Sequence, residues 1–319
     1  MNIVVLDGYT LNPGDLNWDA FEALGQVTVY DRTDLAQVVE RAQEADVILT
    51  NKTPLNADMI AALPRLRYIG VLATGYNIID LPAAAAKGIT VTNIPDYSTM
   101  SVAQLVFAYV LEHCHHVQRH SDAVQDGQWS RSEHFMFANY PMFELAGKTI
   151  GIVGFGQIGQ QVARLAVAFG MNVRVNSRTK KQIAGLEAVE FTSLEQLLAA
   201  SDYVTLHCPL TEQTQRLINK DTIRLMKTNA FLINTARGGH IAEEELATAL
   251  NEGRIAGAAV DVLSVEPPPT SNPLIGARNC LITPHIGWAT YEARQRLMAI
   301  AANNLAQYQT GTPINRVYG

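Results

Sequence analysis

Three ionisable side chains in the second half of the chain are of the types needed to bind and protonate a small organic acid. Arg237 follows an apolar, strand-like run, Glu266 precedes three prolines, and His285 lies in a Pro-His-Ile-Gly segment. Arginine can hold a carboxylate through two charge-assisted hydrogen bonds, and histidine can donate a proton near neutral pH. A carboxylate against the second ring nitrogen would fix the histidine tautomer. Together these types suit the reduction of a 2-oxo acid, whereas each alone would also fit a surface salt bridge, a loop carboxylate or a capped histidine.

A glycine-rich turn earlier in the chain has the spacing of a dinucleotide-binding motif. The strand-like run Thr149–Val153 leads directly into Gly-Phe-Gly-Gln-Ile-Gly, and a helical stretch follows. The first glycine permits a tight turn, the second lets the backbone approach a pyrophosphate, and the third lets the helix pack on the strand. The helix start would offer free N–H groups to the phosphates, although a turn without a ligand is the alternative. The predicted cofactor contacts here are Gly154, Gly156, Gln157, Ile158 and Gly159.

The residues after the next strand bear on the choice between NAD and NADP. In NAD-binding proteins an acidic residue about 20 positions beyond the motif binds the ribose 2′-hydroxyl. Here Ser177, Arg178 and Thr179 occupy these positions, and no carboxylate is present. An arginine can bind a 2′-phosphate, and hydroxyl groups can add donors. The sequence therefore favours NADP(H) as the cofactor, with NAD(H) and a solvated basic turn as the alternative.

Short apolar runs alternate with helical segments along the chain. Strands are predicted over 3–7, 27–30, 47–50, 68–72, 90–93, 149–153, 172–176, 203–207, 231–235, 258–262 and 281–283. Helices are predicted over 35–45, 81–87, 101–120 and 291–309. Strands that alternate with helices form parallel sheets covered on both faces. Because 319 residues exceed the size of one usual core, two α/β domains are expected.

The composition excludes several classes of protein. Hydrophobic residues make up 48% and charged residues 17%, as in soluble globular proteins. The net charge of −6 argues against a nucleic-acid-binding surface. No apolar run reaches the length of a membrane span, and the first residues lack the basic leader of a signal peptide. With only three scattered cysteines, we expect a cytoplasmic protein without nucleic-acid or membrane partners.

Three histidines on one face of the predicted long helix raise the question of a metal site. They are His113, His116 and His120. A metal would need further ligands, and no carboxylate is clearly provided by a partner segment. We therefore predict a polar helix face and no metal.

The chain resembles the D-isomer-specific 2-hydroxyacid dehydrogenase family over essentially its full length. The motifs that carry the resemblance are the Gly154–Gly159 turn, His207-Cys208-Pro209-Leu210-Thr211, Thr235-Ala236-Arg237-Gly238, Asp261-Val262-Leu263 before Glu266-Pro267, and Pro284-His285-Ile286-Gly287. The resemblance implies two doubly wound parallel-sheet domains. A Rossmann cofactor domain (100–290) would be inserted into a discontinuous, flavodoxin-like substrate domain (1–99 and 291–319).

The resemblance also implies roles for the residues named above. Arg237 would bind the substrate, His285 would be the general acid and base, and Glu266 would support His285. Asp261 would hold the nicotinamide carboxamide. Further cofactor contacts would come from His207, Pro209, Thr235 and Ala236.

The substrate-binding residues expected from the resemblance lie mainly near the fourth predicted strand. Backbone N–H groups around Thr74 and Gly75, after Ala73, would face the substrate carboxylate. The sequence Leu-Ala-Thr-Gly-Tyr-Asn at 72–77 resembles the glycerate dehydrogenase or hydroxypyruvate reductase branch of the family. Trp288 is a further feature of this resemblance and a further expected substrate contact.

The expected activity is the reversible, NAD(P)-dependent reduction of hydroxypyruvate or glyoxylate to the D-2-hydroxy acid. One alternative is another D-2-hydroxyacid dehydrogenase, acting on lactate or phosphoglycerate. A second is an NAD(P)-sensing binding protein similar to corepressors of this fold, without catalysis. The resemblance also implies a homodimer, with the helix from Ser101 and the loop Trp129–Phe143 as the contact.

Overall fold

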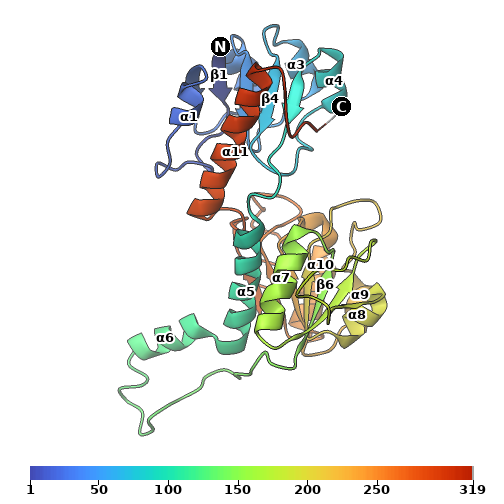
Figure 1. The fold of residues 1–319 in the computed structure, drawn as a ribbon. Coiled ribbons are helices and arrows are strands. Elements are labelled where there is room, and N and C mark those ends of the chain that lie inside the picture. The colour runs from blue at the N-terminus through green and yellow to red at the C-terminus, as the bar shows by residue number, and fades with distance from the viewer. Residues whose placement is uncertain (318–319) are drawn as a thin grey trace. The chain divides into compact units, whose positions relative to one another are not determined.

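The computed structural model describes residues 1–317 and divides the chain into two compact α/β units (Figure 1). Unit 1 comprises Met1–Ser98 together with the segment that begins at Ala289, and unit 2 is Thr99–Trp288. The sequence placed the two boundaries after residues 99 and 290. Unit 2 is thus inserted into the chain of unit 1, and each unit is described by itself below.

Unit 1 is built on a parallel five-stranded sheet in the order β2-β1-β3-β4-β5. This is the strand order of flavodoxin-like folds, so the predicted fold of this unit is confirmed. The strands are short and, except for β2, mostly buried. Their bounds are β1 Asn2–Val5, β2 Gln26–Val29, β3 Val47–Thr50, β4 Tyr68–Val71 and β5 Thr90–Thr92.

Side chains cap the N-termini of three helices of unit 1. The Asp80 carboxylate accepts a hydrogen bond from the Ala83 N–H and caps α4 (Leu81–Ala86), and Thr290 caps α11 (Tyr291–Gln309). The predicted helix over 35–45 is a 3₁₀ turn, η1 (Leu35–Gln37), followed by a short α-helix. The remaining helices are α1 Asp19–Glu22, α2 Val38–Ala42 and α3 Ala57–Ala61.

Unit 2 contains a seven-stranded parallel sheet in the order β12-β11-β10-β9-β6-β7-β8. Numbered from β6, this is the 3-2-1-4-5-6 order of a Rossmann fold with one more strand at the edge, so the predicted fold class is confirmed. The two-residue strand β8 was not predicted, because it is too short to show a periodic pattern. The bounds are β6 Thr149–Val153, β7 Asn172–Asn176, β8 Glu190–Phe191, β9 Tyr203–Leu206, β10 Phe231–Asn234, β11 Gly257–Val260 and β12 Cys280–Ile282.

Helices α5 and α7 lie side by side over this sheet, and α8, α9 and α10 belong to the same unit (Figure 1). The Phe107 and Phe169 rings stack with centroids 5.2 Å apart where α5 meets the end of α7. The bounds are α5 Thr99–His115, α6 Val117–Gln125, α7 Gln157–Ala168, α8 Leu194–Ala200, α9 Lys220–Leu225 and α10 Glu243–Asn251. Within residues 1–317, no helix is both long and apolar enough to cross a membrane.

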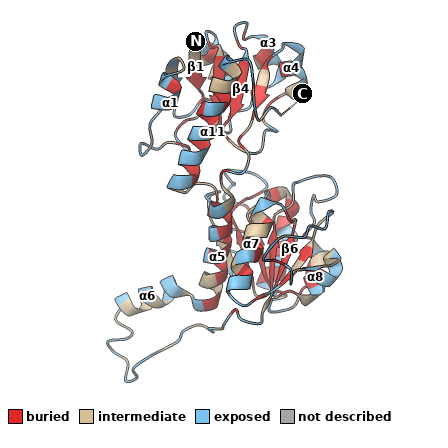
Figure 2. Cartoon of the chain, in the orientation of Figure 1, coloured by how far each residue is buried: buried red, intermediate tan, exposed pale blue. Residues whose placement is uncertain are grey.

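The long helix predicted over 101–120 is wrong in one respect, because it breaks at His116. That residue has a φ of 48°, in the left-handed region, and separates α5 from α6. Cys114 is the last buried residue of α5, whereas every residue of α6 is exposed or partly exposed (Figure 2). The core contacts of the helix therefore end at Cys114, and beyond this residue no packing favours a straight continuation. We refer to residues 117–143, α6 with the loop after it, as the arm.

Candidate active site

His285 and Glu266 form the central pair of the candidate site. The His285 Nδ1 lies 2.6 Å from the Glu266 Oε2, and the two side chains are 26% and 33% exposed. The other carboxylate oxygen accepts a hydrogen bond from the Leu263 N–H at 3.0 Å. Because the carboxylate can only accept, Nδ1 carries the proton and Nε2 faces away from Glu266. The structure therefore brings together two of the three predicted catalytic residues in the orientation that a proton-transferring histidine needs.

The backbone turn around His285 is held by Asp261. His285 has a φ of 56°, which is uncommon outside glycine, so the turn needs external support. The buried Asp261 carboxylate accepts the N–H groups of Ile286 (2.8 Å) and Gly287 (2.7 Å), and Thr283 donates to it as well. Both carboxylate oxygens are thus engaged within the protein. The contact with the nicotinamide carboxamide that we expect of Asp261 stays a prediction. In the structure, this residue supports the backbone turn at His285.

Arg237 stands at the turn that follows the carboxyl end of β10. Its guanidinium is exposed, donates to the Ala236 carbonyl at 2.7 Å, and has no carboxylate partner among residues 1–317. The buried Asn234 side chain fixes this turn at both ends, donating to the Arg237 carbonyl and accepting the Ala236 N–H. The charge is therefore free to meet an anionic substrate. Sequence reasoning did not assign Asn234 this role.

Close backbone packing joins the Arg237 turn to the segment that carries Glu266. A Cβ atom on Gly238 would lie 2.0 Å from the Leu263 carbonyl carbon and 2.3 Å from the Ser264 nitrogen. The buried Glu243 carboxylate accepts the Ser264 N–H at 2.7 Å and fixes the same segment. Arg237 and Glu266 consequently belong to one packed assembly. Glu243 was missed because its partner lies 21 residues away and no local pattern marks it.

The glycine-rich turn fits a phosphate-bearing cofactor. Gly154 has a φ of 96°, and a Cβ there would lie 2.5 Å from the Cys208 nitrogen. A Cβ on Gly159 would lie 2.3 Å from the Gly154 oxygen, so the start of α7 packs tightly on β6. Beside Gly156, by contrast, no atom lies within 4 Å of a Cβ position, which leaves open space next to the first N–H groups of α7. Each glycine thus has the task that the dinucleotide motif requires.

The other predicted cofactor residues of unit 2 follow the carboxyl ends of β7, β9 and β10, where nucleotides bind in such sheets. They are Ser177, Arg178, Thr179, His207, Pro209, Thr235 and Ala236. The Thr235 hydroxyl is buried and has no partner among the described residues, as expected of a group whose partner is a ligand. Burial lowers the pKa of His207 to about 3, so this ring is neutral at physiological pH.

The predicted substrate residues of unit 1 follow the carboxyl end of β4. The Thr74 hydroxyl donates to the Ile94 carbonyl at 2.8 Å, and the Asn93 amide donates to the Thr74 carbonyl at 2.8 Å. Within residues 1–317, the N–H groups of Thr74 and Gly75 have no acceptor. Two donors held in a fixed loop suit an anion, which is consistent with the contact expected for Ala73, Thr74 and Gly75.

The three histidines considered for a metal have other partners. The His113 ring stacks on Phe231 with centroids 4.2 Å apart, and burial lowers its pKa to about 4. The His120 Nδ1 lies 3.0 Å from the His116 carbonyl oxygen, so it donates within the helix. In the part of the chain that the structure describes, no group of three potential metal ligands occurs.

The fold and this site define an α/β oxidoreductase, and comparison with known proteins specifies its family. Residues 107–287 match the model of the D-isomer specific 2-hydroxyacid dehydrogenase, NAD binding domain. The chain belongs to this family. It is 47% identical over 320 residues to the hydroxypyruvate reductase of Blautia hydrogenotrophica, with 99% of each chain covered. It is 38% identical to the glycerate dehydrogenase of Methylorubrum extorquens, with 88% of each covered, which places it in the branch of these two enzymes.

A solved structure supports the same conclusion. An acyclic imino acid reductase in complex with NADPH and D-Arg shares 30% identity, with a TM-score of 0.86 and full coverage of both chains. The family and this neighbour together indicate a nicotinamide cofactor.

Proposed function

We propose that the protein reduces hydroxypyruvate and glyoxylate to the D-2-hydroxy acid, reversibly, in the cytoplasm. The observation that carries the proposal is the 2.6 Å contact between His285 and Glu266. It lies in the same packed assembly as Arg237, which has no carboxylate partner among residues 1–317. The names of the relatives from Blautia and Methylorubrum support the choice of substrate. Three free cysteines fit a reducing compartment.

Each residue has a defined task in the proposed reaction. The glycine turn of unit 2 would hold a nicotinamide dinucleotide, whose chemistry would be the transfer of a hydride to or from the carbonyl carbon. Arg237 holds the substrate carboxylate and polarises the carbonyl. The N–H groups of Thr74 and Gly75 in unit 1 are proposed as a further anion-binding group. His285 Nε2 donates its proton to the carbonyl oxygen, and Glu266 stabilises the imidazolium before this transfer. The histidine then takes a new proton from water. Trp288 is proposed to contact the substrate.

The test of this function is a comparison of initial rates. Hydroxypyruvate, glyoxylate, pyruvate and a bulkier 2-oxo acid are each assayed with NADPH and with NADH. We expect hydroxypyruvate or glyoxylate to give the highest kcat/KM. A preference for pyruvate or the bulky acid would instead indicate another dehydrogenase of the family. Absence of turnover with all four, with dinucleotide binding retained, would favour a nucleotide-sensing binding protein.

We propose NADPH as the preferred cofactor, because the exposed Arg178 lacks an acidic partner among residues 1–317 and follows β7. Changing Arg178→Gln should raise the KM for NADPH by about 10- to 100-fold, since a charge-assisted contact to phosphate is lost. The KM for NADH should stay within about twofold, since NADH lacks that phosphate. The exposed neighbour Lys181→Gln is the matched control. Equal changes for both cofactors, or a wild type that prefers NADH, would contradict the assignment.

We propose a homodimer in which the arm contacts a second copy. The arm exposes large apolar side chains without a core of their own, and Phe135 is 88% exposed. Such clustered exposure is typical of an interface. The exposed apolar residues of the arm are Val117, Trp129, Phe135, Met136 and Met142.

Changing Phe135→Asp should shift the protein from dimer to monomer, because an apolar contact is replaced by a buried charge. Analytical ultracentrifugation at micromolar protein measures the shift. His134→Gln, an adjacent exposed change, should leave the dimer intact. A wild type that sediments as a monomer would refute the dimer.

A further inference from the structure

His240 is fully buried, three residues after Arg237, at the end of the 3₁₀ turn η2 (Gly238–His240). Its Nδ1 lies 3.0 Å from the Thr214 carbonyl oxygen, and its Nε2 lies 3.0 Å from the Cys208 carbonyl oxygen. The ring therefore bridges two points of the segment 207–214, which leaves the carboxyl end of β9. None of the tasks described above uses this side chain.

The two contacts determine the protonation of the ring. A carbonyl oxygen can only accept, so each ring nitrogen has to donate, and a neutral imidazole has only one N–H. The Cys208 thiol, 3.9 Å from Nε2, is a weak and distant alternative donor, and burial raises its pKa so that it stays neutral.

The bridged segment contacts the dinucleotide turn directly. The space that a Cβ on Gly154 would need is filled by the peptide between His207 and Cys208. The same segment also contacts the turn that follows Arg237. A Cβ atom on Gly239 would lie 2.9 Å from the Cδ2 atom of Leu210. The order of contacts is thus the Arg237 turn, then His240, then Cys208, then the glycine turn.

We propose that His240 is a positioning residue that carries a proton on each ring nitrogen and ties the 207–214 segment to the Arg237 turn. Through this bridge, the backbone at the dinucleotide site and the guanidinium at the substrate site keep a fixed spacing. The inference rests on the proposed function in one respect, which is the use of hydroxypyruvate as the test substrate. The expected effect on dinucleotide binding does not depend on that function.

The protonation is tested first, on the wild-type protein labelled with ¹⁵N-histidine. The His240 signal is assigned by its loss in His240→Gln. Two protonated nitrogens are expected in the folded protein, whereas the unprotonated nitrogen of a neutral ring would overturn the proposal. This measurement does not require turnover.

The positioning role is tested with His240→Gln and His240→Leu. The glutamine can replace one of the two donors and the leucine neither. We expect the Kd for NADPH and for NADH, measured by nicotinamide fluorescence, to rise about tenfold in the leucine variant and less in the glutamine variant. The KM for hydroxypyruvate should rise in parallel, while kcat falls less. Unchanged dinucleotide affinity in a folded leucine variant would overturn the proposal.

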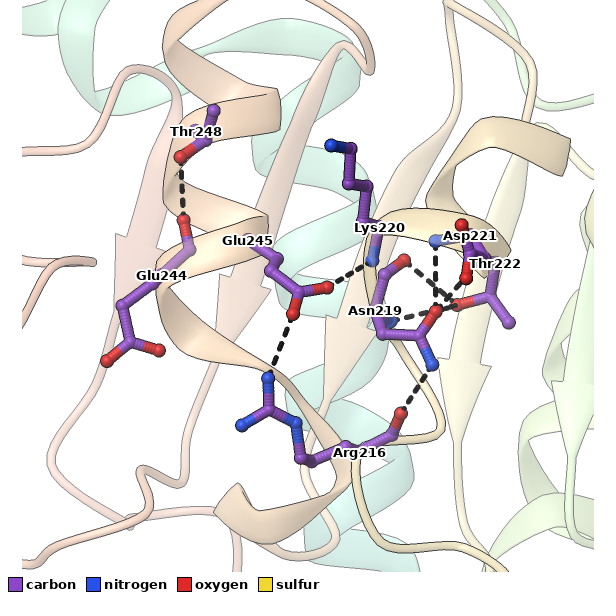
Figure 3. A network of polar contacts seen from close by, with 8 residues as sticks. All are labelled: Arg216, Asn219, Lys220, Asp221, Thr222, Glu244, Glu245 and Thr248. Carbon is purple, nitrogen blue, oxygen red and sulfur yellow. Dashed lines mark hydrogen bonds and ion pairs between the residues drawn. The ribbon is translucent and has the colours of Figure 1, made fainter.

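An ion pair between α10 and the segment before α9 provides the matched control (Figure 3). Glu245 on α10 binds the Arg216 guanidinium at 2.9 Å and accepts the Lys220 N–H, next to the Asn219 capping box of α9. Glu245→Gln removes this ion pair but touches neither Cys208 nor Thr214. It should lower the urea midpoint slightly and leave both dinucleotide affinities unchanged. Equal loss of affinity in this control would show that general loosening, and not the histidine bridge, is responsible.

If no 2-oxo acid is reduced by the wild type, the proposed function fails, but the ¹⁵N signal and the dinucleotide affinities still decide the role of His240.

Discussion

Replacing His285→Gln should lower kcat for hydroxypyruvate reduction by about 10²- to 10⁴-fold, the usual contribution of a positioned general acid. Glutamine is of similar size and can still contact Glu266, but its amide cannot donate a proton to the developing alkoxide. The loss should fall on kcat, because His285 is proposed to act in the chemical step and Arg237 in substrate binding. Steady-state kinetics with NADPH measure the change, and the Kd for NADPH serves as the control that should stay constant.

The rates of reduction and oxidation should change in opposite directions with pH if His285 is the general acid and base. Reduction consumes a proton, so its rate should fall as the pH rises, whereas the reverse oxidation releases a proton and should accelerate. His207 and His113 are not the source of such a profile, because burial lowers their pKa values to about 3 and about 4 and keeps both rings neutral. A reductive rate that is flat with pH, or a kcat that survives in the glutamine variant, would exclude His285 as the acid.

Replacing Gly238→Ala should be the most damaging change outside the ionisable residues. The new methyl carbon would lie 2.0 to 2.3 Å from backbone atoms of Leu263 and Ser264, which must move by about 1 Å or more. This separation would displace Arg237 from the segment of Glu266, and a displacement of that size can cost about 10²-fold in rate. Overpacking should also lower the unfolding free energy by about 1–3 kcal/mol. Kinetics and urea unfolding of the same preparation measure both effects.

The adjacent glycine is the control for this change. A Cβ on Gly239 would meet only the Leu210 side chain, which can rotate, so Gly239→Ala should reduce kcat much less. If both alanine variants behaved alike, the tight backbone contact at Gly238 would not be what holds the site together.

Much of this architecture was predictable, because it depends on local patterns. The run from Thr149 through Gly159 specifies a strand, a phosphate-binding turn and a helix by residue type alone, and the structure has these elements. The alternation of strands and helices likewise predicted both sheets. The family resemblance added the pairing of His285 with Glu266, two residues 19 positions apart that the structure brings into contact.

The supporting residues were not predictable, because their roles arise from contacts between distant segments. Glu243 acts on a segment 21 residues away, and His240 on carbonyl groups up to 32 residues away. No local sequence pattern predicts either contact. Similarly, the apolar periodicity of α5 gave no sign of the left-handed residue His116, at which the core ends.

The central claim is that this chain transfers a hydride to a small 2-oxo acid with D-stereochemistry. The most direct measurement follows one turnover equivalent of hydroxypyruvate with NADPH and determines the chirality of the product. The account predicts one D-glycerate formed for each NADPH oxidised. Formation of L-glycerate, or binding of NADPH without oxidation in the presence of hydroxypyruvate and every other 2-oxo acid tested, would contradict it.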